Sequence, residues 1–158
     1  MHRIVIVNST PIIALIGINQ LDILKSLYNE IIIPEAVYNE ISVKDSKILD
    51  NIDWIHIKPI SNVAAKETFI SSLHDGEVEV MILAKELSSD VIIIDDGLAR
   101  RHAKYLGLNI TGTIGVLLKA KNDGVINSIK PLMDDLINEG FYISNTVYTD
   151  VLQLANEV

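Results

Sequence analysis

Hydrophobic and polar residues alternate along this chain in blocks whose lengths fit strands and helices in turn. Short runs of β-branched residues, at 31–33 and 91–94, have the composition of strands buried on both faces. Longer segments, such as 145–156, repeat their apolar residues at helical spacing. We predict strands at 3–7, 31–33, 54–60, 91–94, 108–110 and 141–143. We predict helices at 11–15, 20–28, 34–41, 76–88, 97–106, 113–122, 128–139 and 145–156.

Residues that favour helix ends support this division. Thr10 reads as an N-cap before Pro11 at the first helical position, and Asp75 reads as the cap of the long helix that follows it. Gly124 and Gly140 each stop a helix. Strands that alternate with helices predict a three-layer α/β/α sandwich with a mainly parallel central sheet.

The length fits one domain over residues 1–158, with a C-terminal helical extension at about 126–158. The polar stretch 42–52 is predicted to be a loop. No apolar run reaches the roughly 18 residues of a membrane span. Polar residues interrupt the apolar N-terminal segment, which argues against a signal peptide. The chain has no cysteine, which excludes disulfides and thiolate zinc sites and fits a reducing cytoplasm.

The chain is acidic, because 13 basic against 21 acidic residues give a formal net charge of −8. Such a charge disfavours non-specific nucleic-acid binding, which depends on neutralising phosphates. A nucleic-acid enzyme therefore needs a bound metal and a local basic patch to reverse the sign near its site.

The main candidate for chemistry is the pair Asp95-Asp96, directly after the predicted strand 91–94. The carboxyl ends of strands in an α/β sheet form the crevice where ligands bind. Two carboxylates there repel each other unless a cation or a proton lies between them. The pair therefore predicts a divalent metal site.

Three further polar residues occur where such a fold brings element ends together: Asn8 after the first strand, Glu40 in the last turn of its helix and Glu77 in the first turn of the next. Each has a structural alternative. Asn8 could shape a turn, Glu77 could interact with the helix dipole, Glu40 could be solvated, and one of Asp95 and Asp96 could cap a helix.

Oxygen ligands of this kind suit Mg²⁺ or Mn²⁺, which also keep waters and bind substrate phosphate. The four histidines show no zinc-ligand spacing, and the chain contains neither a phosphate-binding Gly-x-x-x-x-Gly-Lys loop nor a Gly-x-Ser-x-Gly elbow.

A basic cluster of Arg100, Arg101, His102 and Lys104 follows the aspartates on one predicted helix. It is either a solvated face or a phosphate contact beside the metal. The turn that begins at Thr111 (Thr-Gly-Thr-Ile-Gly) could offer backbone N–H groups to an anion, although glycine is also common in such turns.

Together these features resemble the PIN-domain family of metal-dependent nucleases, in the branch common in bacteria and archaea. The resemblance covers most of residues 4–122, and it is carried by the segments 4–15, 33–41, 75–84, 92–96 and 106–115. It implies a parallel sheet flanked by helices, with acidic residues gathered over Mg²⁺ or Mn²⁺ in a central cleft.

Carried over by position, Glu40, Glu77 and Asp96 match the second, third and fourth acidic sites, and Asp95 is an adjacent helper or substitute. Asn8 occupies the place of the usual first aspartate. An amide oxygen can ligate Mg²⁺ but brings no charge and cannot act as a base. The resemblance thus implies a metal site of weakened affinity, formed by these five residues.

Three functions remain open. The first is a metal-dependent endoribonuclease that acts on single-stranded RNA, in which Ser9, Arg100, Arg101 and Thr111 contact substrate phosphate. By family analogy, this protein is the toxin of a toxin–antitoxin pair, with an antitoxin protein as its partner, and it forms a homodimer. The second is a PIN-like binding protein that lost catalysis with its first carboxylate. The third is a phospho-acceptor receiver domain, which is disfavoured because the first strand ends in no acidic pair.

Overall fold

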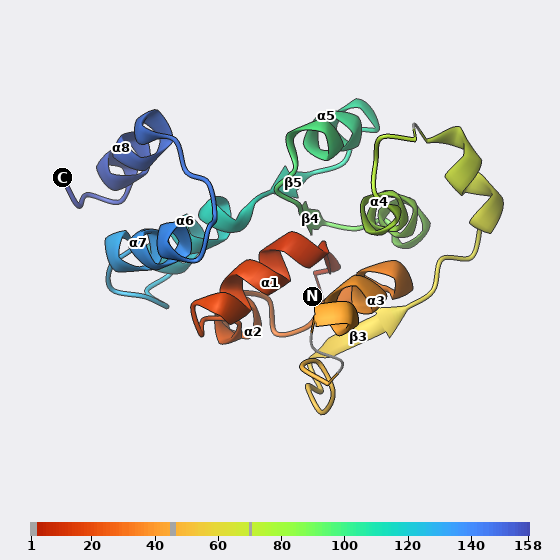
Figure 1. Ribbon diagram of the computed structural model, residues 1–158, viewed down its shortest axis with the longest axis horizontal. Coiled ribbons are helices and arrows are strands. Elements are labelled where there is room, and N and C mark those ends of the chain that lie inside the picture. Colours follow the sequence, from red (N-terminus) through yellow and green to blue (C-terminus); the bar gives the residue numbers. More distant parts are fainter. Residues whose placement is uncertain (1–2, 45–46, 70) are drawn as a thin grey trace.

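The structure, a computed structural model, describes residues 3–44, 47–69 and 71–158. Its centre is a five-stranded sheet in the order β3-β2-β1-β4-β5, and every pairing is parallel (Figure 1). The strands are β1 (Val5–Val7), β2 (Ile31–Pro34), β3 (Ile55–Lys58), β4 (Val91–Ile93) and β5 (Ile110–Thr111). β1 and β4 lie next to each other, with Val7 opposite Ile93. The predicted α/β sandwich is confirmed, and its sheet is wholly parallel.

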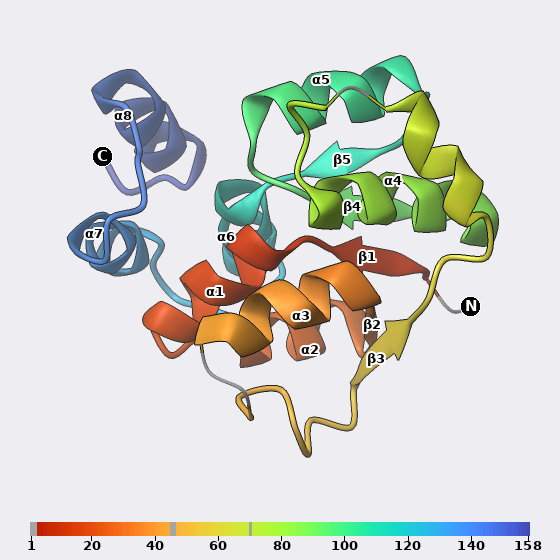
Figure 2. The same ribbon diagram turned by 45° about the vertical axis from the view of Figure 1, so that its right-hand side comes forward.

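Helices cover both faces of this sheet. They are α1 (Ser9–Gly17), α2 (Asp22–Tyr28), α3 (Glu35–Lys44), α4 (Asp75–Leu87), α5 (Gly97–Tyr105), α6 (Thr113–Asn122), α7 (Lys130–Asn138) and α8 (Asn145–Leu154). In the view of Figure 2, α3 and α4 lie in front of the strands, and α2 and α6, which contact each other, lie behind. The β-branched runs form the inner layer because their side chains are apolar on both faces: Ile6, Ile33 and Ile92 are fully buried.

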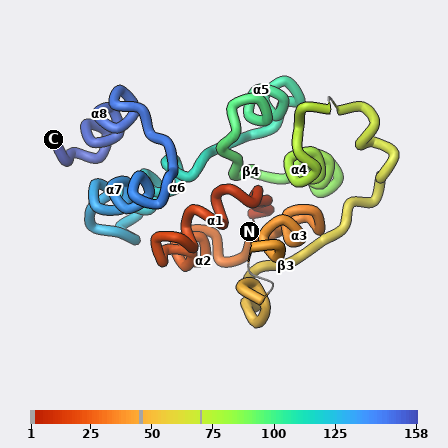
Figure 3. The backbone as a smooth tube through the Cα atoms, in the orientation of Figure 1, coloured from red at the N-terminus to blue at the C-terminus, as the bar shows by residue number. Residues whose placement is uncertain are grey.

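Two segments of the chain lie away from the sheet. Between β3 and α4 it passes around the outer edge of the molecule through a short 3-10 helix, η1 (Val63–Thr68), which the sequence pattern did not predict (Figure 3). After α6 it continues into α7 and α8, which lie beside the sandwich at one end of the molecule. None of the described helices is by itself long and apolar enough to span a membrane, and only the sharply bent pair of α1 and α2 passes that test together.

Several predicted element ends are wrong. The N-cap of α1 is Asn8 and not Thr10, and the N-cap of α4 is His74, so that Asp75 is the first helical residue. α3 runs to Lys44, past the predicted end at residue 41, because no helix-breaking residue occurs there. Glu40 therefore lies inside the helix and not in its last turn, where the sequence placed it. Residues 45–46 of the predicted loop lie outside the described residues.

The predicted strand at 141–143 is also wrong, since these residues form no regular element. The Phe141 amide donates to the carbonyl of Leu136, 2.9 Å away, and so completes the end of α7. The turn passes through Gly140 at φ +95°, a conformation that glycine adopts without strain.

Reciprocal hydrogen bonds join α3 and α4 as an antiparallel pair. The Ala36 amide at the start of α3 donates to Oε1 of Glu79 in α4, at 3.1 Å. The Gly76 amide at the start of α4 donates to Oε1 of Glu40 in α3, at 2.9 Å. Each helix thus satisfies an unpaired N–H group at the other's N-terminus. Lys66 of η1 adds an ion pair to Glu79 at 2.7 Å.

A single carboxylate connects α6, α7 and the end of α8. Glu157 accepts hydrogen bonds from the Lys121 ammonium (2.8 Å), the Ser128 hydroxyl (2.7 Å) and the amides of Ile129 (2.8 Å) and Lys130 (3.0 Å). Burial alone would raise the pKa of Glu157, but these four donors together lower it from the usual 4.5 to about 2.

We expect Glu157→Gln to lower the free energy of unfolding at pH 7 by roughly 1–3 kcal/mol, because an amide leaves donors poorly paired. A lowered pKa in the folded state stabilises the fold above pH 4.5, and this contribution disappears as the pH falls from 4.5 towards 2. The deficit of the variant should therefore shrink in that window. Urea unfolding followed by circular dichroism at pH 7, 4.5 and 3 measures it. Asp150→Asn, which removes an exposed charge from α8, is the control, and equal effects of the two variants would contradict this role.

Candidate metal centre

Parallel pairing brings the ends of β1 and β4 to the same edge of the sheet. Asn8 directly follows β1, and its backbone N–H donates to the carbonyl of Ile93 in β4, at 2.9 Å. Asp95 and Asp96 follow two residues later, after Ile94. The predicted first and last ligand positions therefore follow the ends of two neighbouring strands.

Glu40 is held by two donors from different elements. The Ser9 hydroxyl, at the start of α1, donates to Oε2 at 2.6 Å, and the Gly76 amide donates to Oε1 at 2.9 Å. Glycine at position 76 leaves room for this carboxylate, because a Cβ there would stand 2.9 Å from the Glu40 carboxyl carbon and displace it. Glu40 thereby fixes the starts of α1 and α4 against α3, at the edge where β1 ends.

Glu77 is buried, with 5% of its surface exposed, and its Oε1 accepts a hydrogen bond from the His74 amide at 2.9 Å. Burial raises the pKa of this carboxyl. The His74 hydrogen bond opposes the rise, and the negative charges of Asp96 and Glu40 add to it. Because these two charges act on Glu77, three carboxylates from α3, α4 and the end of β4 share one electrostatic environment.

The two aspartates have different surroundings. Oδ2 of Asp96 accepts from the Ala99 amide at 3.0 Å and caps α5, which leaves Oδ1 without a partner among the described residues. Both carboxylate oxygens of Asp95 accept hydrogen bonds from Thr113. Oδ1 accepts from the backbone amide at 2.8 Å, and Oδ2 accepts from the hydroxyl at 2.6 Å. Burial raises the pKa of Asp95, while Thr113 and the charge of Arg100 lower it. Asp95 thus anchors the start of α6, and Asp96 is the member of the pair that acts on Glu77.

Asn8 is 2% exposed, and its Oδ1 is buried without a hydrogen-bond partner in the described part of the chain. Its backbone is extended (φ −77°, ψ 168°), and its side chain does not cap α1, so neither strain nor capping explains an asparagine here. A buried unpaired acceptor costs roughly 1–3 kcal/mol. This oxygen is the observation that most directly points to a ligand beside the carboxylates.

The donor set fits Mg²⁺ or Mn²⁺, since all of its donors are amide and carboxylate oxygens. In residues 3–44, 47–69 and 71–158, however, no three histidine or acidic side chains stand together as a formed metal site. Each carboxylate is instead held by a helix N-terminus or a hydroxyl. An ion at this edge must therefore use the oxygens left over, together with waters.

The four residues that were predicted to contact substrate phosphate differ in their surroundings. Nη1 of Arg100 donates to the Ile94 carbonyl at 3.0 Å, so this arginine points inward to the sheet. Ser9 is committed to Glu40, and Thr111 is half-buried at the end of β5. Arg101 is exposed, and its Nη1 lies 3.9 Å from where a Cβ on Gly97 would stand, above the first turn of α5. Of these residues, Arg101 alone is exposed, and its guanidinium lies over the first turn of α5, the helix that Asp96 caps.

Sequence reasoning missed two residues that shape this edge. The turn that holds Thr113 was expected to offer backbone N–H groups to an anion, but the sequence did not show that this anion is the Asp95 side chain, 18 positions earlier. Gly76 was passed over because a glycine at a helix start shows no chemistry by itself. A hollow of about 830 Å³ lies at the opposite edge, where Arg3, Tyr28 and Trp54 meet the amino ends of the strands, and no predicted site residue lines it.

Comparison with known families agrees with this arrangement. A family model described as a PIN domain matches residues 4–157. The chain belongs to the PIN-domain family. The match includes α7 and α8, so this PIN domain extends beyond the segments that carried the resemblance. The family is nuclease-like in general, and PIN domains generally depend on a divalent metal. The comparison with curated proteins gives no significant match.

We expect Glu77→Gln to stabilise this PIN domain at neutral pH when divalent metal is absent. The amide oxygen still accepts from His74, and the charge repelled by Asp96 and Glu40 is removed. Because the folded-state pKa of Glu77 is raised, its ionisation costs nothing well below pH 4.5 and costs stability as the pH rises through 4.5 to the raised value.

The measurement is urea unfolding in EDTA at pH 7.5 and at pH 3.5, with the exposed Glu67→Gln as the control. The variant should exceed the wild type at pH 7.5 and lose that advantage at pH 3.5. Added Mn²⁺ should then stabilise the wild type more than the variant. A variant that is less stable than the wild type in EDTA at neutral pH would show that Glu77 is not under electrostatic strain.

Proposed function

We propose that this PIN domain is a divalent-metal-dependent endoribonuclease that hydrolyses phosphodiester bonds of RNA in the cytoplasm. The observation that carries the proposal is the buried, unpartnered Oδ1 of Asn8 at the edge where Glu40, Glu77 and Asp96 collect negative charge. An acceptor without a donor and carboxylates that repel one another are both stabilised by a cation.

Asn8, Glu77 and Asp96 would hold the ion, Mg²⁺ or Mn²⁺, through their free oxygens, with Glu40 and Asp95 adjacent. Bound there, a divalent ion lowers the pKa of a water and stabilises charge on the leaving oxygen. The neighbouring residues of the chain hold the carboxylates in place. Ser9 and Gly76 fix Glu40, His74 fixes Glu77, and Thr113 fixes Asp95.

The substrate and the partners that we propose rest on the family of this chain and not on contacts within the structure. We propose single-stranded RNA as the substrate, with Arg101 closest to its phosphates. By analogy with small PIN proteins, this chain is the toxin of a toxin–antitoxin pair, covered by an antitoxin protein and active as a homodimer.

A second candidate function is a PIN domain that binds nucleic acid or a partner protein without cleaving. One observation favours it: the position of the usual first aspartate holds Asn8, which is neutral. An amide adds no charge to attract the ion and cannot take a proton from water.

We expect RNA cleavage by the wild type to require Mn²⁺ or Mg²⁺ and to be lost in Asp96→Asn. Asparagine caps helices as well as aspartate does, so α5 should keep its N-cap and the fold its stability. Loss of a ligand should exceed the roughly 100-fold that loss of an outer-shell contact costs. Cleavage of a labelled single-stranded oligoribonucleotide, in metal and in EDTA, tests this, with Asp150→Asn as the control. Cleavage that persists in EDTA or in Asp96→Asn would refute the metal-dependent mechanism.

The variant Asn8→Asp separates the two candidate functions in the same assay. If the neutral ligand limits an otherwise competent nuclease, restoring the carboxylate should raise Mn²⁺ affinity and cleavage together. If the chain is a binding protein, Mn²⁺ affinity rises and cleavage stays absent.

A further inference from the structure

The outward face of α5 differs from the rest of this acidic chain. Its exposed residues are Gly97, Arg101, Lys104 and Tyr105, and we call this set the α5 face. The helix contains no acidic residue, although the whole chain carries a net charge of −8. Arg101 and Lys104 form no ion pair with any described residue, so their charge is free for another partner.

The other sides of α5 are fixed by the protein itself. Ala99 and Ala103 are fully buried against the core. His102 contacts the ring of Phe69, at 6.2 Å between ring centroids, and Arg100 donates to the Ile94 carbonyl. The helix therefore presents the α5 face in one fixed orientation, and the side chains of this face form no ion pair within the described part of the chain.

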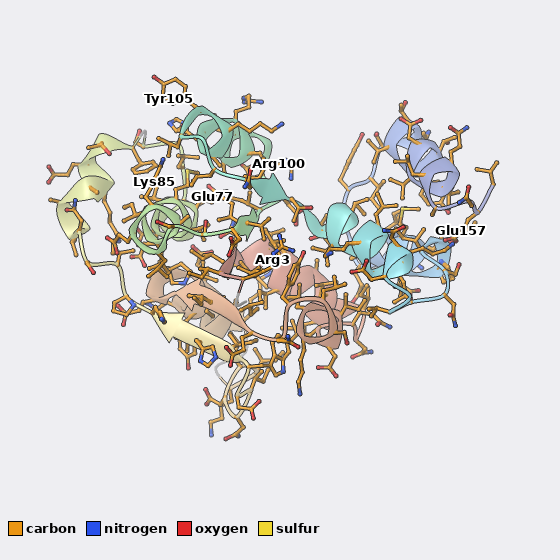
Figure 4. The ribbon with its side chains drawn as sticks, turned by 180° about the vertical axis from the view of Figure 1, so that it is seen from behind. Arg3, Glu77, Lys85, Arg100, Tyr105 and Glu157 are labelled. Atoms are coloured by element: carbon orange, nitrogen blue, oxygen red, sulfur yellow. The ribbon has the colours of Figure 1, made fainter. Side chains whose placement is uncertain are left out.

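Tyr105 is the unusual member of the α5 face. It is 88% exposed, and it forms no hydrogen bond or ring contact with residues 3–44, 47–69 or 71–158. Figure 4 shows it projecting outward from the far end of α5, while Arg100 lies at the sheet end. A large aromatic surface left in water offers a flat face on which another ring can stack.

The α5 face begins at the candidate metal centre. Asp96 is the N-cap of α5, and the Arg101 guanidinium lies above Gly97 in the first turn. Tyr105 follows Arg101 by one helical turn, about 6 Å further along the helix. A strand leaving the carboxylates along α5 therefore passes Arg101 first and then Lys104 and Tyr105.

We propose that the α5 face binds single-stranded RNA next to the candidate metal centre. Arg101 and Lys104 contact phosphates, and Tyr105 stacks on a base. This inference rests on the proposed nuclease function and adds the residues that select the substrate. Stacking needs an unpaired base, and it accepts any of them because every base has a π-face. The α5 face thus selects single strands without reading sequence, and it supplies the local positive charge that an acidic nuclease needs.

The test is equilibrium binding of a fluorescently labelled single-stranded 12-nucleotide RNA, followed by anisotropy in EDTA so that nothing is cleaved. Tyr105→Ala should weaken binding roughly 5- to 140-fold, and Tyr105→Phe should restore it. Tyr142→Ala, which removes a tyrosine that is 75% exposed outside α5, is the matched control and should have no effect. A duplex of the same sequence should bind more weakly and be insensitive to Tyr105→Ala.

Charge is tested in the same assay as a function of salt. Arg101→Gln and Lys104→Gln should each lower the slope of log affinity against log salt by about 0.7, the value for one phosphate contact on a single strand. Lys25→Gln, an exposed lysine of α2, should leave the slope unchanged. Equal effects of Lys25→Gln and Lys104→Gln would overturn the proposal, because binding would then depend on general charge alone.

Failure of this inference can be told apart from failure of the proposed function. If the wild type cleaves RNA with Mn²⁺ while Tyr105→Ala changes neither the affinity in EDTA nor KM, the nuclease stands and the α5 face is wrong. If RNA binding depends on Tyr105 but no metal supports cleavage, the α5 face stands and the nuclease is wrong. Absence of RNA binding in EDTA would overturn the α5 face directly.

Discussion

The position of the Glu40 carboxylate is the constraint on which the candidate site depends. One oxygen accepts from the Ser9 hydroxyl after β1, and the other accepts from the Gly76 amide at the start of α4. These bonds connect the end of a central strand to two helices that are far apart in sequence. The reciprocal bond from Ala36 to Glu79 holds α3 and α4 in the same register. Glu77 follows Gly76 directly, so the arrangement that fixes Glu40 also places Glu77.

Holding acidic groups at this edge has an electrostatic cost. Burial and the charges of Asp96 and Glu40 act together on Glu77, and no described basic side chain forms an ion pair with Glu40, Glu77 or Asp96. Such a cluster is common at functional sites, where stability is given up for chemistry. Asn8 moderates the cost, because an amide adds no fourth negative charge to the cluster. Compared with an aspartate at this position, the amide would also attract a cation less strongly.

Much of the fold could be predicted because its signals are local. β-branched runs marked the sheet, and Asn8, Asp95 and Asp96 marked the edge where β1 and β4 end. The errors have long-range causes. His74 replaced Asp75 as the N-cap of α4 because the helix starts where Gly76 meets Glu40, 36 positions away. Residues 141–143 have strand composition, but the Phe141 amide is used by the end of α7. The separation of Asp95 from Asp96 depends on Thr113, which no local pattern connects to either.

The central claim is that the free oxygens of Asn8, Glu77 and Asp96 converge on one divalent ion. Anomalous diffraction from crystals of the wild-type protein grown with Mn²⁺ tests it most directly, because manganese is located without reference to any assumed ligand. The account predicts one strong anomalous peak at the edge where β1 and β4 end, bonded to Oδ1 of Asn8 and to at least one of the two carboxylates at about 2.0–2.3 Å. A structure at saturating Mn²⁺ with no peak there, or with Asn8 Oδ1 bonded to a protein donor instead, would contradict it.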